Sequence, residues 1–171
     1  MEEIVLSNLH IRVDREQTLE AIYRKESQRV YNIALRLMGN HHDAEDIVSE
    51  VFLKVHYGLK KFKYKSSVGT WIYRITINTC RDVWKKRKKE VENTESYFKI
   101  THKEDSTERF VFLKKAIENL PYKLREIFIL HEIGGFTHDE IAKIANVPKG
   151  TSKSYLHRAK KKLREELEEW L

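Results

Sequence analysis

Aromatic and cationic side chains are interleaved most densely between Lys60 and Lys89, in the stretch KKFKYKSSVGTWIYRITINTCRDVWKKRKK. Lysine and arginine neutralise phosphates whatever the base sequence, while aromatic rings offer flat faces on which unpaired bases stack. The combination predicts a surface for single-stranded nucleic acid. The candidates for base stacking are Phe62, Tyr64, Trp71 and Tyr73.

Two periodicities compete from Trp71 onward. Alternate residues as far as Thr79 suit one side of a strand, whereas a stripe with steps of three and four suits a helix. The helical stripe comprises Trp71, Arg74, Asn78, Arg81 and Lys85. Because this stripe continues further along the chain, it predicts a helix whose opposite, buried face holds Ile72, Ile75, Thr79 and Val83. Trp71 and Tyr73 suit a core position as well as a base platform.

Three carboxylates, those of Asp43, Asp46 and Glu50, are spaced three and four residues apart and so line one edge of a predicted helix. With His41 and His42 beside them, they could hold magnesium or manganese in a nuclease. Acids along one straight helix rarely converge on an ion without ligands from elsewhere. Two other readings stay open: an acidic first turn that complements the helix dipole, and an edge for docking to a protein.

The bulk properties limit the classes of function. A formal charge of +7 on 171 residues and a pI near 9.3 favour a polyanionic partner, and the cations concentrate in residues 81–89 and 149–164. The single cysteine, Cys80, excludes an internal disulfide framework and a cysteine-rich zinc site. The sequence contains no apolar run of membrane-spanning length and no secretion signal at its start, so we expect a cytoplasmic protein without membrane insertion.

The elements that position these residues are all predicted to be helices, in two small domains. Helices are expected over residues 19–38, 41–57 and 70–89, and again from residue 107 to Gly134-Gly135 with an interruption at Pro121. A polar stretch, residues 90–106, separates the two groups and predicts a flexible linker, in which Tyr97 and Phe98 are the apolar contacts.

The last two helices, residues 137–145 and from residue 149 onward, have the layout of a helix-turn-helix, whose second helix enters the major groove. Thr137 and Glu140 form a predicted capping box. The packing stripe of the long helix comprises Leu156, Ala159, Leu163, Leu167 and Trp170. The alternative is an ordinary helical bundle with a basic, solvated final helix.

Three motifs, in this order and at these separations, resemble the extracytoplasmic-function sigma factors of bacteria. They are DAEDIVSEVFLKV (residues 43–55), GTWIYRITINTCRD (residues 69–82) and the helix-turn-helix segment of residues 120–167. The resemblance covers roughly residues 21–167. It implies an alternative sigma factor, not an enzyme by itself, that binds core RNA polymerase, recognises a promoter and helps to melt it.

The resemblance also implies a role for each segment. Residues 16–90 correspond to sigma region 2, residues 91–106 to a linker and residues 107–171 to sigma region 4. The contacts implied with the β′ coiled coil of the polymerase are Asp43, Asp46, Ser49 and Glu50. The contacts implied with the minus-ten element, which is melted, are Phe62, Lys63, Tyr64, Lys65, Trp71, Tyr73, Arg74, Asn78, Arg81 and Lys85.

The helix-turn-helix would read the minus-thirty-five element as duplex DNA. The residues implied for this contact are Lys149, Thr151, Lys153, Ser154, His157, Arg158 and Lys161. Further implied partners are the polymerase β flap and an anti-sigma factor, with no cofactor and no metal, and the protein would be associated with the nucleoid. A rival reading is a DNA-binding regulator that uses the helix-turn-helix without polymerase, for which the aromatic-basic stretch and the acidic edge would be coincidences.

Three residues depart from the family pattern. Ser152 stands where an apolar residue is usual, which predicts looser packing of the recognition helix or a hydroxyl bonded to the backbone. Asn146 stands in the turn where glycine is frequent, and asparagine tolerates a left-handed backbone. Tyr155 replaces the usual arginine. These departures affect which minus-thirty-five sequence is read and leave the predicted function unchanged.

Overall fold

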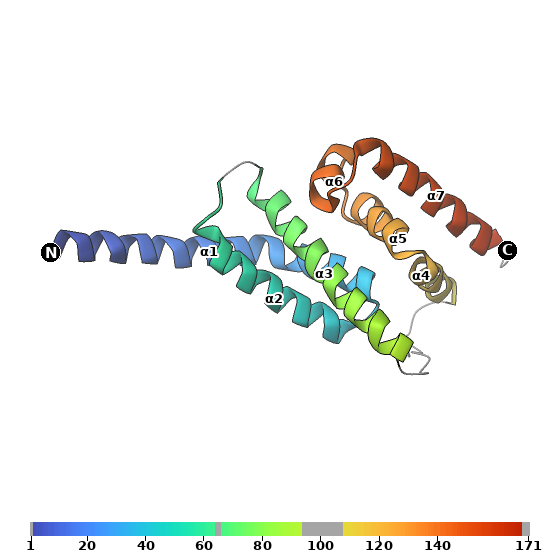
Figure 1. The fold of residues 1–171 in the computed structure, drawn as a ribbon, viewed down its shortest axis with the longest axis horizontal. Coiled ribbons are helices and arrows are strands. Elements are labelled where there is room, and N and C mark those ends of the chain that lie inside the picture. The colour runs from blue at the N-terminus through green and yellow to red at the C-terminus, as the bar shows by residue number, and fades with distance from the viewer. Residues whose placement is uncertain (1, 64–65, 94–107, 169–171) are drawn as a thin grey trace.

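The computed structural model describes residues 2–63, 66–93 and 108–168, and in this part of the chain it contains helices and no strand (Figure 1). The elements are α1 (Glu2–Met38), α2 (His41–Leu59), α3 (Val68–Asn93), α4 (Glu108–Asn119), α5 (Tyr122–Phe128), the π-helical turn η1 (Ile129–Ile133), α6 (His138–Ala145) and α7 (Lys149–Glu168). The prediction of an all-α fold with two helical domains is confirmed. Tyr97 and Phe98, the apolar residues of the predicted linker, lie outside the described residues.

The first helix begins well before the predicted start at Leu19. The sequence from Glu2 to Met38 contains neither proline nor glycine, so no residue breaks the helix before Leu19, where the stripe used for the prediction begins. The N-terminal part of α1 extends past α2 and α3 (Figure 1). The helix ends where predicted, because Gly39 adopts a φ of 80° and donates its backbone N–H to the Leu35 carbonyl at 2.8 Å.

The first unit, α1 to α3, buries the apolar faces that the sequence pattern indicates. Val30, Ile33 and Leu37 of α1 are at most 1% exposed, and they belong to the same core as the apolar faces of α2 and α3. On α3, Ile72 and Thr79 of the predicted buried face are fully enclosed, and Ile75 and Val83 are partly enclosed. The helical interpretation of this stretch is therefore correct, and the strand interpretation is wrong.

In the second unit, α4 to α7, the chain turns between α5 and α6, and this turn leads into the helix-turn-helix. Pro121 separates α4 from α5, as the sequence predicts. The chain then widens into η1, where Gly134 donates its N–H to the Ile129 carbonyl at 2.8 Å and Phe136 donates to the Leu130 carbonyl at 3.1 Å. A Cβ on Gly134 would lie only 2.7 Å from the Leu130 oxygen. Glycine at this position is what allows the turn to close.

The helix-turn-helix itself forms as predicted, with one difference at Ser152. Thr137 and Glu140 make the capping box of α6, and Asn146 ends that helix with a left-handed φ of 55°. Ser152 is fully buried, and its hydroxyl is 2.9 Å from Nδ1 of His138. The polar side chain thus fits the packed position through a bond to another side chain, and neither loose packing nor a backbone bond is found.

Replacement of Thr137 by alanine should lower the free energy of unfolding by about 1 kcal/mol. The threonine hydroxyl accepts the Glu140 N–H at 3.3 Å, and this bond caps the start of α6. Chemical denaturation followed by circular dichroism measures the loss. Thr137→Ser keeps the hydroxyl and should stay close to the wild type, and an equal loss in both variants would contradict the capping role.

The two units lie against each other, with α6 packed on α3 and η1 packed on α1 (Figure 1). The contacts include aromatic pairs, with Tyr73 against Phe136 at 4.8 Å between ring centroids and Trp84 against Tyr122 at 4.7 Å. Within the described residues, no helix is long and apolar enough to cross a membrane.

Candidate nucleic-acid interface

Three of the four predicted polymerase contacts form an exposed edge on α2. Ser49 is exposed, with its hydroxyl 3.0 Å from the Glu45 carbonyl. Asp46 lies 3.2 Å from His42, and Glu50 lies 2.6 Å from Lys54, each within one turn of the same helix. Such exposed pairs are weak and exchange readily with a partner's charges. The edge is therefore available to another protein.

The fourth predicted contact, Asp43, is enclosed. It is 7% exposed, its backbone N–H bonds to the Asn40 side chain at 2.8 Å, and its carboxylate is paired with Arg87 of α3. Asp43 therefore holds the start of α2 against the end of α3 in this structure. The carboxylates of Asp43, Asp46 and Glu50 each face a different side chain, so they do not converge as the nuclease hypothesis requires.

Two exposed apolar residues of α2 were missed by the sequence analysis. Leu53 is 58% exposed and Tyr57 is 72% exposed, and both follow Asp46 and Glu50 at helical spacing. The four residues share one face of α2. Their spacing in steps of four, three and four was visible in the sequence, but the pattern alone did not show that Leu53 and Tyr57 lie outside the buried stripe.

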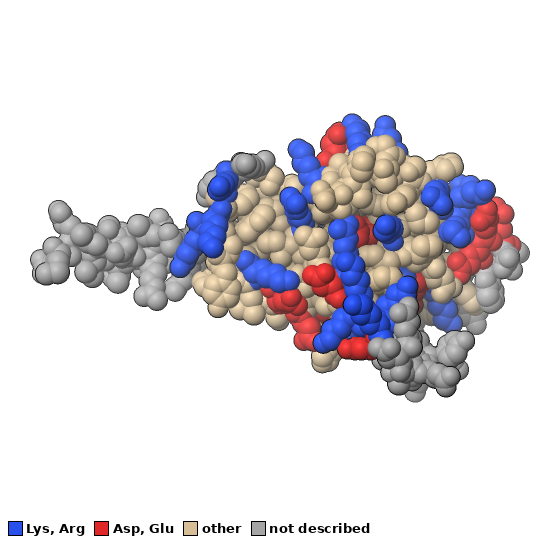
Figure 2. Space-filling view, in the orientation of Figure 1, with Lys and Arg blue, Asp and Glu red and all other residues tan. Residues whose placement is uncertain are grey.

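The aromatic-basic stretch forms α3 and the loop before it, and the structure distributes its predicted DNA contacts among three environments. Arg74, Asn78 and Lys85 are exposed on one stripe of α3. Lys63 of the preceding loop is also exposed, whereas Tyr64 and Lys65 lie outside the described residues. Figure 2 shows cationic side chains gathered over the C-terminal half of α3 and, separately, over α7.

Phe62 and Trp71 form a pair at the start of α3. Their ring centroids are 4.7 Å apart with planes inclined by 30°, and both side chains are partly exposed. Gly58 lies beneath the indole, where a Cβ would approach Trp71 to 2.8 Å. The loop thus presents two aromatic side chains that are packed on each other and still reach solvent.

Tyr73 is not available for base stacking in this structure. It is 3% exposed, its hydroxyl donates to the Glu26 carboxylate, and its ring packs edge-on against Phe136 of the second unit. Burial, followed by the bond to Glu26, raises the pKa of the Tyr73 hydroxyl above its usual value. From the sequence, core and base-platform roles are equally expected for Tyr73, and in the structure it lies in the core.

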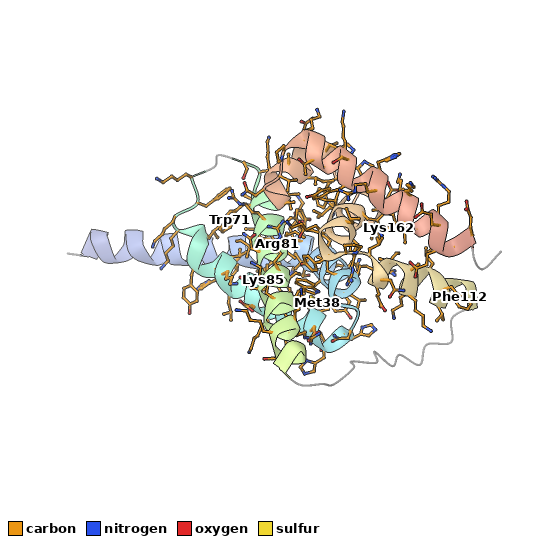
Figure 3. All side chains as sticks on the ribbon, turned by 45° about the vertical axis from the view of Figure 1, so that its right-hand side comes forward. Met38, Trp71, Arg81, Lys85, Phe112 and Lys162 are labelled. Carbon is orange, nitrogen blue, oxygen red and sulfur yellow. The ribbon has the colours of Figure 1, made fainter. Side chains whose placement is uncertain are left out.

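Arg81 belongs to the same stripe but is engaged by the second unit (Figure 3). Its guanidinium donates two hydrogen bonds to the Glu126 carboxylate, at 2.5 and 2.8 Å, and one to the Ala145 carbonyl at 2.7 Å. The hydrogen bonds to Glu126 raise the pKa of Arg81, while burial raises the pKa of Glu126. Neither partner of Arg81 was predicted from the sequence.

The exposed face of α7 matches the sequence prediction closely. Of the seven implied minus-thirty-five contacts, Thr151 is partly exposed and the other six are exposed. These six are Lys149, Lys153, Ser154, His157, Arg158 and Lys161. Leu156, Ala159 and Leu163 are buried on the opposite side, and Leu167 is partly buried. Trp170 of the predicted stripe lies outside the described residues.

Acidification should weaken the helix-turn-helix through His138. Partial burial, followed by the charges of His131, Lys153 and Lys149, lowers the pKa of His138 from 6.5, and Asp139 opposes this shift. Because the folded pKa lies below the unfolded value, protonation favours the unfolded chain, so stability is lost as the pH falls through the folded pKa.

The free energy of unfolding should therefore fall more steeply between about pH 7 and about pH 5 in the wild type than in His138→Gln. Denaturation curves across this range measure the difference in slope. His157→Gln, which changes an exposed histidine of α7, serves as the control and should retain the wild-type slope. Equal slopes for the wild type and His138→Gln would contradict the assignment.

Comparisons with known proteins agree with this geometry. Residues 22–90 match the family model for sigma-70 region 2, and residues 113–163 match that for sigma-70 region 4. The chain is 33% identical over 155 residues to the ECF RNA polymerase sigma factor SigW of Bacillus subtilis, covering 81% of this chain and 83% of SigW. It is 31% identical over 157 residues to SigE of Mycolicibacterium smegmatis, covering 86% of this chain but 61% of that relative.

A solved structure shares the arrangement of helices. The sigma factor RpoE of Bartonella quintana, in complex with the anti-sigma factor NepR, superposes with a TM-score of 0.76 at 26% identity. The match covers 89% of this chain and 98% of RpoE. The two family models cover the two units described above, and the relatives cover both units together. The chain therefore belongs to the extracytoplasmic-function family of RNA polymerase sigma factors.

Proposed function

We propose that this alternative sigma factor, which directs promoter-specific initiation of transcription, divides the work among three surfaces. The α2 edge binds core polymerase, the exposed face of α7 reads duplex DNA, and the α3 stripe with its preceding loop holds the melted strand. The chain catalyses no reaction by itself, because the polymerase supplies the chemistry. The observation that carries the proposal is the separation of an exposed acidic edge on α2 from an exposed cationic face on α7.

The α2 edge suits a basic, partly apolar partner. Asp46 and Glu50 supply the charge, and Leu53 and Tyr57 supply apolar surface on the same face. Apolar anchors surrounded by polar groups are the usual composition of a protein interface. We assign this face to the β′ coiled coil of the polymerase, and we leave Asp43 to its structural pairing with Arg87.

The face of α7 suits the major groove of the minus-thirty-five element. Lys153 and Arg158 are positioned to meet phosphates, and Ser154 and His157 between them offer polar groups for base edges. The packed side of α7 is held by the buried Ser152 and by Leu156, so the recognition face has a fixed orientation. The same unit is the candidate for contact with the β flap.

The α3 stripe suits a strand displaced at the minus-ten element. Arg74, Asn78 and Lys85 are exposed along one line, and the Phe62–Trp71 pair stands at the end of that line, where a flipped base could stack. Extruding a base costs only a few kcal/mol, which stacking and hydrogen bonds can offset.

Regulation by an anti-sigma factor is part of the proposal. The Bartonella quintana sigma factor that shares this fold was crystallised with its anti-sigma factor NepR. We propose a partner of this kind here, acting in the cytoplasm where the nucleoid and the polymerase are found.

Reconstitution with bacterial core polymerase tests the function. The holoenzyme is used to select transcribed promoters from a fragment library, and permanganate reactivity then reports unpaired thymines near the selected start sites. Start sites that depend on this chain, with unpaired bases around minus ten, support the proposal. Specific duplex binding without any polymerase binding would favour the DNA-binding regulator instead.

A further inference from the structure

The second unit lies across the middle of the α3 stripe. Arg74 and Asn78 on one side and Lys85 on the other are exposed, whereas Arg81 between them is bonded to Glu126 and to the Ala145 carbonyl (Figure 3). A nucleic-acid strand that follows the stripe would have to pass the residue that α5 and α6 already occupy. The stripe is thus continuous in sequence but interrupted in this arrangement of the two units.

Glu126 offers Arg81 the contact that a phosphate would offer. Both carboxylate oxygens accept hydrogen bonds from the guanidinium, which is the paired geometry that arginine also makes with phosphate. The Glu126 side chain is 3% exposed, whereas that of Arg81 is 27% exposed. A buried carboxylate needs a cation, because without one it pays the full cost of lost solvation.

Two further arginines add polar contacts between the units, beside the aromatic pairs Tyr73–Phe136 and Trp84–Tyr122. Arg29 of α1 donates to the Gly134 carbonyl and lies 4.2 Å from the centre of the Phe136 ring. Arg125 of α5 donates to the Leu37 carbonyl at 3.1 Å. Interfaces between domains of one chain resemble transient protein contacts, so relative movement of the two units is the default expectation.

We infer that the second unit closes the minus-ten surface of the free chain, with Glu126 holding Arg81 in place of a phosphate of single-stranded DNA. The face of α7 stays open in the same arrangement, because its predicted contacts are exposed. The free chain therefore binds duplex DNA through α7 and binds single-stranded DNA poorly through α3. This inference rests on the proposed function of α3 and adds a device that controls it.

The test uses the full chain, with two readouts. Lys86→Cys on α3 and Lys162→Cys on α7, both exposed, carry a dye pair whose energy transfer reports the distance between the units. Cys80 stays in place, because it is fully enclosed and its burial raises the pKa of its thiol, which keeps it unreactive. Fluorescence anisotropy measures binding to a labelled single-stranded oligonucleotide of mixed sequence.

Glu126→Gln keeps the shape of the side chain and removes its charge, and Arg29→Gln weakens the contact at a separate place. Each change should lower the energy transfer and raise the affinity for the single strand, by about tenfold or more for Glu126→Gln. Arg81→Gln should lower the transfer without the gain in affinity, since it removes the DNA contact as well. Glu165→Gln, an exposed change on α7, should alter neither readout.

Duplex binding shows that the second unit of each variant is folded, because α7 carries that activity independently of Arg81. Unchanged transfer and unchanged single-strand affinity in both Glu126→Gln and Arg29→Gln would overturn the inference. Transcription by the reconstituted holoenzyme would continue in that case, so the proposed function would stand. If the holoenzyme reconstituted with the wild-type chain does not transcribe, the proposed function is wrong.

Discussion

Asp46→Arg combined with Glu50→Arg is expected to reduce binding to core RNA polymerase by more than about 100-fold. The two carboxylates are exposed on one face of α2, and a partner with basic groups would meet two cations in the variant where it meets two anions in the wild type. Like charges at a contact cost several kcal/mol, which exceeds the loss from simple removal of the carboxylates. Titration of labelled chain with core polymerase measures the change.

The matched control reverses two exposed acids elsewhere, Glu165→Arg with Glu168→Arg on α7. This control changes the net charge by the same amount and should retain binding to polymerase. Both double variants should unfold close to the wild type, because each of the four acids is exposed. Equal losses in the two variants would show a general charge effect. Undiminished binding of the α2 variant would show that polymerase binds another surface of the chain.

Lys153→Ala combined with Arg158→Ala should weaken duplex binding and reduce its dependence on salt. Each phosphate contact contributes about 0.9 to the slope of the logarithm of the affinity against that of the salt concentration, so two contacts contribute about 1.8. The loss should be largest at low salt. Titrations of duplex DNA at several salt concentrations measure both the affinity and the slope.

Lys162→Ala with Arg164→Ala is the control for this prediction, because both cations are exposed on α7 but lie outside the predicted recognition face. Their removal takes the same charge from the same helix and should leave most of the slope in place. A slope that falls equally in both variants would indicate a general electrostatic effect. If Lys153→Ala with Arg158→Ala leaves the slope unchanged, these two residues do not contact phosphates.

The helices could be predicted from the sequence because their signals are local. The alternation of buried and exposed residues on α3, the interruption at Pro121 and the capping box at Thr137 each depend on residues within a few turns of one another. The exposed face of α7 follows from its packing stripe for the same reason. The start of α1 at Glu2 was not predicted, because the prediction rested on the apolar stripe between Leu19 and Met38.

The environment of the α3 stripe could not be predicted, because it depends on contacts between distant segments. Arg81 and Glu126 are separated by 45 residues, and their pairing requires that the second unit packs on α3 in one particular way. The sequence around Tyr73 suits the core and base stacking equally, and only the contact with Phe136, a distant residue, shows that it lies in the core. The spacing of Asp43 on α2 matches that of the acidic edge, but its pairing with Arg87 depends on another helix and has no local signal.

The backbone geometry at Gly134 limits which residues the second unit can accept at this position during evolution. A side chain there would strike the Leu130 carbonyl, and the Gly134 carbonyl also accepts the hydrogen bond from Arg29. Gly150, at the start of α7, has no atom within 4 Å of a Cβ added there, so substitution at that position meets no obstacle. Among random variants that still fold, we expect glycine to be kept at Gly134 and other residues to be accepted at Gly150.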